Sequence, residues 1–468
     1  MRMSAAQTAA YVCIYLLAGL FAGLVVLQFR EAGTPSFAFA WHRRAQPAST
    51  PSDASSTSPA GSNGVDNTTP PWTFEYTRDG NNHGLSEEQC TAAFPLLTME
   101  IDRAVEYRHN VAGNITLDDL EIKWRGHGIL RILIHENQLY IVDTLNVGRG
   151  HRTRYLATLN SINAALRSYP GTLPTVEFTF TVQDNSLIGE GNSNRTVLAY
   201  ARRAEEPSVW LMPDFVFWGW PQFGMPSYAA DFRAVLDDSE MAFLDKKPQL
   251  VWRGSIDNNP ARKKLAELSK DQPWSNVRGI DWLNKEDPTK NVISMEEHCD
   301  YMFTAMTEGM TWGGRLKLLL NCHSVMISHE MAWLEWYHHL LAPSGEAQNY
   351  ILLEHFDGLR KTMRRLLEPA HRHEAQRIAD NARRVFREQY LTPAAVSCYW
   401  RALFRGWASV QGFQPSPWME PEVDPSRTGK LRRRPRGTSF EAYAIMESTE
   451  WEVPAQPRML VNDPETYW

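Results

Sequence analysis

The chain has 468 residues, of which 43% are hydrophobic and 11% aromatic, and this apolar content is ample for two globular domains. It excludes a chain that is disordered over most of its length. The formal net charge of −6 argues against a nucleic-acid partner, because neutralising phosphates requires a basic face. A compact basic run from Arg432 to Arg436 fits a solvated tail better than such a face.

An apolar segment lies close to the amino terminus. The uncharged stretch from Tyr11 to Leu27, with its neighbours, approaches the roughly 20 residues needed to cross a bilayer. We therefore predict a transmembrane signal anchor over residues 9–29, preceded by a cytosolic tail over residues 1–8. A cleaved secretory signal is the alternative, but its apolar region usually has roughly 7 to 15 residues and no clear cleavage site precedes Gln28.

The residues after the anchor predict a lumenal location. Ser, Thr, Pro, Ala, Gly and Asn dominate the sequence from Ala45 to Pro70, which predicts a flexible stem over residues 30–72. Three sequons, at Asn67, Asn114 and Asn194, would accept N-glycans only in the lumen of the secretory pathway.

Cysteine usage agrees with an oxidising compartment. Cys13 lies within the predicted anchor, and four others follow it: Cys90, Cys299, Cys322 and Cys398. An even number suits two disulfides, although four buried free thiols are an equally good interpretation. The spacing alone does not fix the pairing.

The first half of the folded region begins with strands. Alternating apolar residues predict strands at 120–124, 129–134 and 139–142, joined as an antiparallel meander with a turn at Glu136-Asn137. A helix with apolar positions between Leu156 and Leu166 follows, and then a buried strand over 176–182. We assign this part to an α/β domain over residues 73–240.

The second half alternates strands with helices, which predicts a parallel sheet. The expected elements are strands at 249–253, 324–327 and 350–353, and helices at 260–269, 296–308, 315–321, 357–367 and 369–390. We assign them to a second α/β domain over residues 241–412. Proline, charge and weak periodicity predict an irregular tail over residues 413–468.

Glycine and arginine occur together at two junctions between a strand and a helix. Gly313 and Gly314 leave backbone N–H groups unshielded just before a predicted helix, and Arg315 adds a guanidinium that can bind phosphate oxygens. Upstream, a strand ends at Gly254, and Arg262 falls in the first turn of the next predicted helix. Each could be an ordinary helix start with a solvated arginine. Together, at the carboxyl ends of parallel strands, they predict a diphosphate site.

A candidate general base follows the buried strand of the first half. Asp184 lies at the position where a side chain would face a cleft at the edge of the sheet, although an Asp that caps a turn is the simpler interpretation. The histidines lack ligand-like spacing and the chain contains no Asp-x-Asp, so we predict no metal site. Trp218 and Trp220 could contact a sugar, although most tryptophans belong in cores.

These segments together resemble glycosyltransferase family 90, which contains the Rumi-like protein O-glucosyltransferases and the fungal capsule-associated xylosyltransferases. The resemblance covers roughly Leu117 to Trp407. It rests on Pro213-Asp214-Phe215 with Trp218-x-Trp220-Pro221, Trp252-Arg253-Gly254 with Arg262, His298-Cys299-x-Tyr301, Gly314-Arg315-Leu316-Lys317-x-Leu319-Leu320, and Gln348-Asn349-Tyr350. The segment Gln348-Asn349-Tyr350 is most similar to the fungal branch of the family.

The resemblance implies a GT-B fold, in which two Rossmann-like domains face a cleft. It also implies inverting transfer of xylose or glucose from a UDP-sugar, without a metal or other cofactor, by a single-pass type II membrane protein of the Golgi or endoplasmic reticulum. The acceptor would be a hydroxyl group of a glycan or glycoprotein. A catalytically inactive lumenal glycan-binding protein with the same fold is the alternative. A hydrolase would need a second acid near Asp184, for which Glu190 is the close candidate.

The resemblance also implies roles for individual residues. Asp184 matches the catalytic aspartate, although Asn185-Ser186 follow it where relatives usually have a proline soon afterwards. The residues implied to bind the UDP-sugar are Arg253, Gly254, Ser255, Arg262, Trp312, Gly313, Gly314 and Arg315. Cys299 and Cys322 lie where Rumi-like members have a disulfide, which leaves Cys90 to pair with Cys398.

Overall fold

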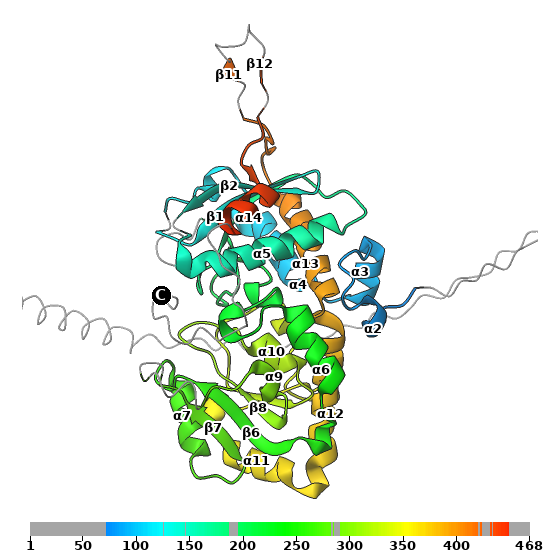
Figure 1. The fold of residues 1–468 in the computed structure, drawn as a ribbon, viewed down its shortest axis with the longest axis vertical. Helices are drawn as coiled ribbons and strands as arrows, with labels where there is room; N and C mark the ends of the chain where they lie inside the picture. Colours follow the sequence, from blue (N-terminus) through cyan, green and yellow to red (C-terminus); the bar gives the residue numbers. More distant parts are fainter. Residues whose placement is uncertain are drawn as a thin grey trace, which may run out of the picture. The chain divides into compact units, whose positions relative to one another are not determined.

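Two separate β-sheets organise the chain (Figure 1). The computed structural model describes residues 72–124, 126–145, 147–186, 195–281, 284, 291–419, 422–423, 431–432 and 434–448. Within these residues, none of the helices combines the length and the apolar character that crossing a membrane requires. The predicted cytosolic tail and anchor, and the stem up to residue 71, lie outside them.

The first sheet is mixed and has the strand order β13-β2-β1-β3-β4-β5. Its strands are β1 (Ile129–His135), β2 (Gln138–Leu145), β3 (Val176–Thr181), β4 (Leu198–Ala199), β5 (Trp210–Leu211) and β13 (Thr438–Ser439). β1 runs antiparallel to both β2 and β3, with Ile129 opposite Thr181 and Ile134 opposite Val176. β3, β4 and β5 are parallel. The predicted hairpin at Glu136-Asn137 is confirmed, and both residues have positive φ, as a tight hairpin turn requires.

The helices that pack on this sheet include α5 (Arg149–Arg167), α13 (Pro393–Val410) and α14 (Phe440–Ser448). Trp407 of α13 packs against Trp210 and Phe178 at the centre of the core. α13 therefore packs on the first sheet although it falls within the range assigned to the second domain.

The second sheet is fully parallel, as the alternation of strands and helices predicted. Its order is β10-β9-β8-β6-β7. The strands are β6 (Lys247–Gly254), β7 (Ser275–Gly279), β8 (Tyr301–Met306), β9 (Val325–Ser328) and β10 (Ile351–Leu352). The helices around it include α7 (Pro260–Ser269), α9 (Met295–His298), α10 (Leu316–Asn321), α11 (Leu359–Leu367) and α12 (Arg372–Ala382), and a π-helical segment, Arg383–Tyr390, extends α12.

Three predicted elements were wrong. The helix expected at 296–308 is instead the short α9 followed by β8, whose six residues are all buried, and a strand covered on both faces has no period-2 alternation to reveal it. The strand expected at 120–124 is absent, because Glu121 Oε1 accepts hydrogen bonds from the N–H groups of Ile122 and Lys123 and turns the chain. The tail is not wholly irregular, since it supplies β13, α14 and a short hairpin of β11 (Glu422–Val423) and β12 (Leu431–Arg432).

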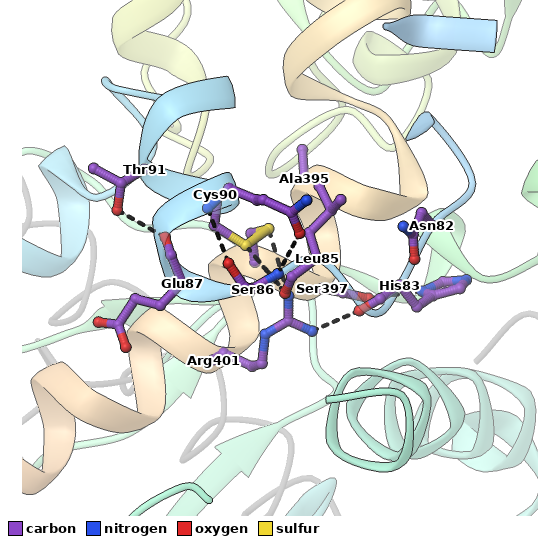
Figure 2. The surroundings of a disulfide bond; sticks show 12 residues. Asn82, His83, Leu85, Ser86, Glu87, Cys90, Thr91, Ala395, Ser397 and Arg401 are labelled. Carbon is purple, nitrogen blue, oxygen red and sulfur yellow. Dashed lines mark hydrogen bonds between the residues drawn. A yellow bond between two sulfur atoms is a disulfide. The ribbon is translucent and has the colours of Figure 1, made fainter. Parts of the chain in front are cut away.

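Within the described residues, short helices that precede the first sheet include α2 (Tyr76–Asp79), α3 (Glu87–Ala93) and α4 (Met99–Tyr107). A disulfide between Cys90 and Cys398 joins α3 to α13, and a second joins Cys299 to Cys322, which confirms the pairing that the family resemblance implied. Figure 2 shows Arg401 beside the first disulfide. Its guanidinium donates to the carbonyl oxygens of His83 and Leu85, so the segment before α3 is fixed to α13 by hydrogen bonds as well as by a covalent bond.

Candidate functional site

Two arginines lie against one tryptophan ring beyond the carboxyl ends of the strands of the second sheet. β6 ends at Gly254, and α7 begins after Asn259, whose side chain accepts a hydrogen bond from Ala261 N at 2.8 Å. Arg262 therefore lies in the first turn of α7, as predicted. Arg315 immediately precedes α10. The guanidinium groups of both arginines lie over the Trp252 ring, each 5.7 Å from its centroid.

Neither of these arginines forms an ion pair with a carboxylate in the described part of the chain. Arg262 donates to the carbonyl oxygens of Glu308 (2.8 Å) and Ser255 (3.0 Å), and Arg315 donates to that of Arg253. Burial lowers the pKa of Arg262. Burial, and then the charge of Arg262, lower the pKa of Arg315 to about 9. Two poorly solvated positive charges without a counter-charge are unfavourable, and a polyanion between them would relieve this cost.

Glycines provide the space that these side chains occupy. A Cβ added to Gly254 would lie 3.0 Å from the Trp252 ring and 3.4 Å from Arg315 Nη2, and one added to Gly309 would lie 3.4 Å from Arg262 Nη2. A Cβ added to Gly313 would lie 2.4 Å from Met306 Cε, so the Met306 side chain would have to move. Gly254 and Gly313 thus allow neighbouring side chains to approach the backbone closely, whereas a Cβ at Gly309 would make only an ordinary contact.

Asp184 follows β3 at the edge of the first sheet, and its side chain is 51% exposed. Arg154 of α5 donates to Asp184 Oδ1 at 2.7 Å and to the carbonyl oxygen of Val182 at 3.2 Å. Asp184 Oδ2 accepts no hydrogen bond within the described residues. Asp184 is therefore oriented by an arginine and still accessible, which suits a group that must accept a proton.

Aromatic side chains connect Asp184 with the Arg315 loop. The Arg154 guanidinium lies 5.1 Å from the centroid of the Phe215 ring, and that ring lies 5.6 Å from Trp220. The Trp220 ring in turn reaches within 3.5 Å of the place where Gly314 would carry a Cβ. A continuous series of contacts thus runs from the candidate base to the paired arginines.

The remaining predicted residues have different surroundings. The Arg253 guanidinium donates to the carbonyl oxygens of Trp252, Asn276 and Asn291, so it is occupied within the protein. Trp312 is buried against Tyr200. Trp218 is 37% exposed and Trp220 is partly buried, so both can be reached from solvent.

Some of the other predictions concern the surface. Asn114 is exposed, whereas Asn67, Asn194 and Glu190 lie outside the described residues. Glu330, Glu354 and His355 are exposed and bring candidate ligand atoms within 4.8 Å of one another. That no metal takes part stays a prediction.

No sequence pattern indicated Arg154 or Glu308 as residues of the site. Arg154 is 30 residues from Asp184 along the chain, and no spacing rule connects them. Glu308 is buried, and its main chain both accepts from Arg262 Nε and donates to His329 Nε2. Burial raises the pKa of the Glu308 carboxyl group. Its position two residues after the end of β8 was hidden because that strand had been predicted as a helix.

Comparisons with known proteins point to a glycosyltransferase family. The family model for "Glycosyl transferase family 90" matches residues 86–444. The chain is similar to O-glucosyltransferase rumi of Drosophila pseudoobscura pseudoobscura, with 27% identity over 312 residues that cover 61% of this chain and 71% of that protein. It is also similar to the O-glucosyltransferase rumi homolog of Anopheles gambiae, with 23% identity over 319 residues that cover 61% of this chain and 75% of that protein.

Proposed function

The chain belongs to glycosyltransferase family 90, and from this membership we propose that it is an inverting enzyme that moves a sugar from a UDP-sugar to a hydroxyl group of a glycan or a protein. The names of the two relatives favour UDP-glucose as the donor and a protein as the acceptor. The similarity of Gln348-Asn349-Tyr350 to the fungal branch favours UDP-xylose. Both sugars therefore belong in the first test.

One observation carries the proposal. Arg262 and Arg315 both lie 5.7 Å from the Trp252 ring centroid, are poorly solvated, and have no carboxylate partner within the described residues. A UDP-sugar supplies two adjacent phosphates, which match two adjacent guanidinium groups. As the bond to the sugar breaks, negative charge develops on the departing UDP, and these groups stabilise it. No Asp-x-Asp occurs in the sequence, so the arginines take the role that a divalent cation has in many other glycosyltransferases.

Asp184 is the proposed general base. Its Oδ2 removes the proton from the acceptor hydroxyl while that oxygen attacks the anomeric carbon of the donor sugar. The UDP oxygen leaves from the opposite face, so a single displacement inverts the configuration. Arg154 orients the carboxylate by binding Oδ1. The exposed faces of Trp218 and Trp220 would contact acceptor or donor sugar, with the donor between two Rossmann-like domains in a GT-B arrangement.

The proposed location is the lumen of the Golgi or endoplasmic reticulum, with residues 9–29 as a type II anchor. Two disulfides support an oxidising compartment, and the exposed Asn114 sequon is consistent with it.

The test is a UDP-release assay on the purified protein with UDP-glucose and UDP-xylose, together with the UDP-dependent shift in melting temperature. We expect release with one of the two donors and a reduction on the order of 100-fold or more for Arg315→Ala. Arg364→Ala, which removes an exposed arginine of α11, serves as the control and should match wild type. Unchanged turnover in Arg315→Ala contradicts the phosphate assignment. A wild-type protein that shows no shift with UDP would instead be a glycan-binding protein with this fold.

A further inference from the structure

A buried cluster of three charged side chains lies directly behind the Arg315 loop. Lys317 of α10 places Nζ 2.7 Å from Asp214 Oδ2 and 3.0 Å from Glu335 Oε2. All three side chains are at most 1% exposed. Asp214 belongs to the segment after β5, and Glu335 to the segment after β9, so one ammonium group joins three parts of the chain.

The carboxylates keep Lys317 charged in spite of its burial. Burial alone would lower the pKa of Lys317, but Asp214 and Glu335 outweigh this effect and raise it. Burial raises the pKa of Glu335, and the charge of Lys317 opposes that rise. Aromatic rings enclose the ammonium group, with the Trp312 centroid 4.6 Å from Nζ. Lys317 therefore has a fixed position and a fixed charge.

Lys317 also contacts the backbone of the loop. Its Nζ donates to the carbonyl oxygen of Gly314 at 3.3 Å. In a trans peptide unit the C=O and the following N–H point in opposite directions, so this contact directs the N–H of Arg315 away from the cluster. That N–H has no acceptor within the described residues, whereas Leu316 N donates to Gly313 O.

We propose that Lys317 is a positioning residue, which holds the Gly314-Arg315 peptide so that its N–H donates to a phosphate of the bound nucleoside diphosphate. This proposal rests on the proposed function, because it needs the same ligand. It assigns the Arg315 loop two contacts with the anion, one from the guanidinium and one from the main chain. Asp214 and Glu335 act through Lys317 and do not touch the ligand.

The test compares UDP with uridine, which lacks the phosphates, by titration calorimetry. Lys317→Met should weaken UDP binding about tenfold and leave uridine binding within about twofold, because the lost contact is with phosphate. A general loss of structure would reduce the affinity for both ligands equally. Glu335→Gln is the matched control, since it leaves Lys317 paired with Asp214 and should keep the ratio of the two affinities.

Lys317→Met leaves two buried carboxylates unpaired and could prevent folding. The variant that combines it with Asp214→Asn and Glu335→Gln removes every charge of the cluster and keeps the side-chain shapes, so it should fold. It should show the same tenfold loss for UDP alone. A folded triple variant with the wild-type ratio of UDP to uridine affinity overturns the role of Lys317. A wild-type protein that binds neither ligand overturns the proposed function as well.

Discussion

Replacing Arg315 by methionine should stabilise the protein in the absence of ligand while it abolishes UDP binding. The pKa of Arg315, lowered to about 9, corresponds to on the order of 5 kcal/mol against its charged form. The replacement loses the hydrogen bond to the carbonyl oxygen of Arg253 and the contact with the Trp252 ring, together about 2 kcal/mol. Arg315 is partly exposed, which reduces the penalty on its charged form below about 5 kcal/mol. We therefore expect a net gain of about 1–3 kcal/mol in the free energy of unfolding.

The measurement is urea unfolding followed by tryptophan fluorescence, with and without UDP. At a UDP concentration of about 100 times Kd, the wild type should gain about 2.7 kcal/mol, and Arg315→Met should gain nothing.

Arg401→Met is the matched control. Arg401 is a buried arginine whose pKa burial likewise lowers, to about 10, and it donates to the carbonyl oxygens of His83 and Leu85 (Figure 2) and to that of Ala165. Its loss removes all three of these hydrogen bonds, which offsets the relief of its burial, so we expect no gain in the free energy of unfolding and an unchanged effect of UDP. An Arg315→Met protein that is less stable than the wild type and still gains stability from UDP would refute the reasoning.

Three further predictions follow from other parts of the structure. Asp184→Asn should keep the affinity for UDP and lose transfer by at least about 100-fold in the UDP-release assay, because the amide cannot accept the proton; unchanged transfer would place the base elsewhere. Replacing Cys90 and Cys398 by serine should lower the free energy of unfolding by about 2–5 kcal/mol, and by more than the same change at Cys299 and Cys322. The reason is that the two disulfides join residues 308 and 23 positions apart, and a longer closed loop restricts the unfolded chain more. Equal losses of stability would contradict this explanation from chain entropy. Burial lowers the pKa of His298 to about 3 from its ordinary 6.5. The neutral ring therefore contributes stability that is complete above pH 6.5 and is lost as the pH falls toward 3, by up to about 1.4 kcal/mol per pH unit. Urea unfolding at pH 7, 6 and 5 should show that the free energy of unfolding depends less steeply on pH in His298→Gln, and an identical pH dependence would contradict the assignment.

The sequence predicted the elements whose signals are local. The cap at Asn259 with Pro260 after it, the hairpin at Glu136-Asn137 and the buried strand before Asp184 all depend on residues within a few positions of one another. β8 could not be recognised in this way, because a strand buried on both faces presents a continuous apolar run that a helix can also have. The same limit hid α14, whose place on the first sheet depends on distant partners.

In the candidate site, too, the features with local sequence signals were predicted and those that depend on tertiary packing were not. The glycine and arginine pairs predicted two phosphate contacts, and the structure brings Arg262 and Arg315 to one ring. The sequence did not indicate that Arg253, between them in the same motif, would donate to three carbonyl oxygens. It also did not indicate that Arg154 would bind Asp184, since only the packing of α5 beside β3 brings them together.

The interaction partners of a poorly solvated cationic side chain indicate whether it stabilises the fold or binds a ligand. Lys317 has two carboxylate partners, so its charge is compensated by the folded chain itself. Arg262 and Arg315 form hydrogen bonds with main-chain oxygens alone and keep their positive charge uncompensated within the described residues. A folded chain gains no stability from such a pair, because each charge is poorly solvated and repels the other. The placement of Arg262 and Arg315 is explained if the substrate brings the missing negative charge. The phosphates of a nucleotide sugar carry that charge, and they become more negative as the nucleoside diphosphate leaves the sugar.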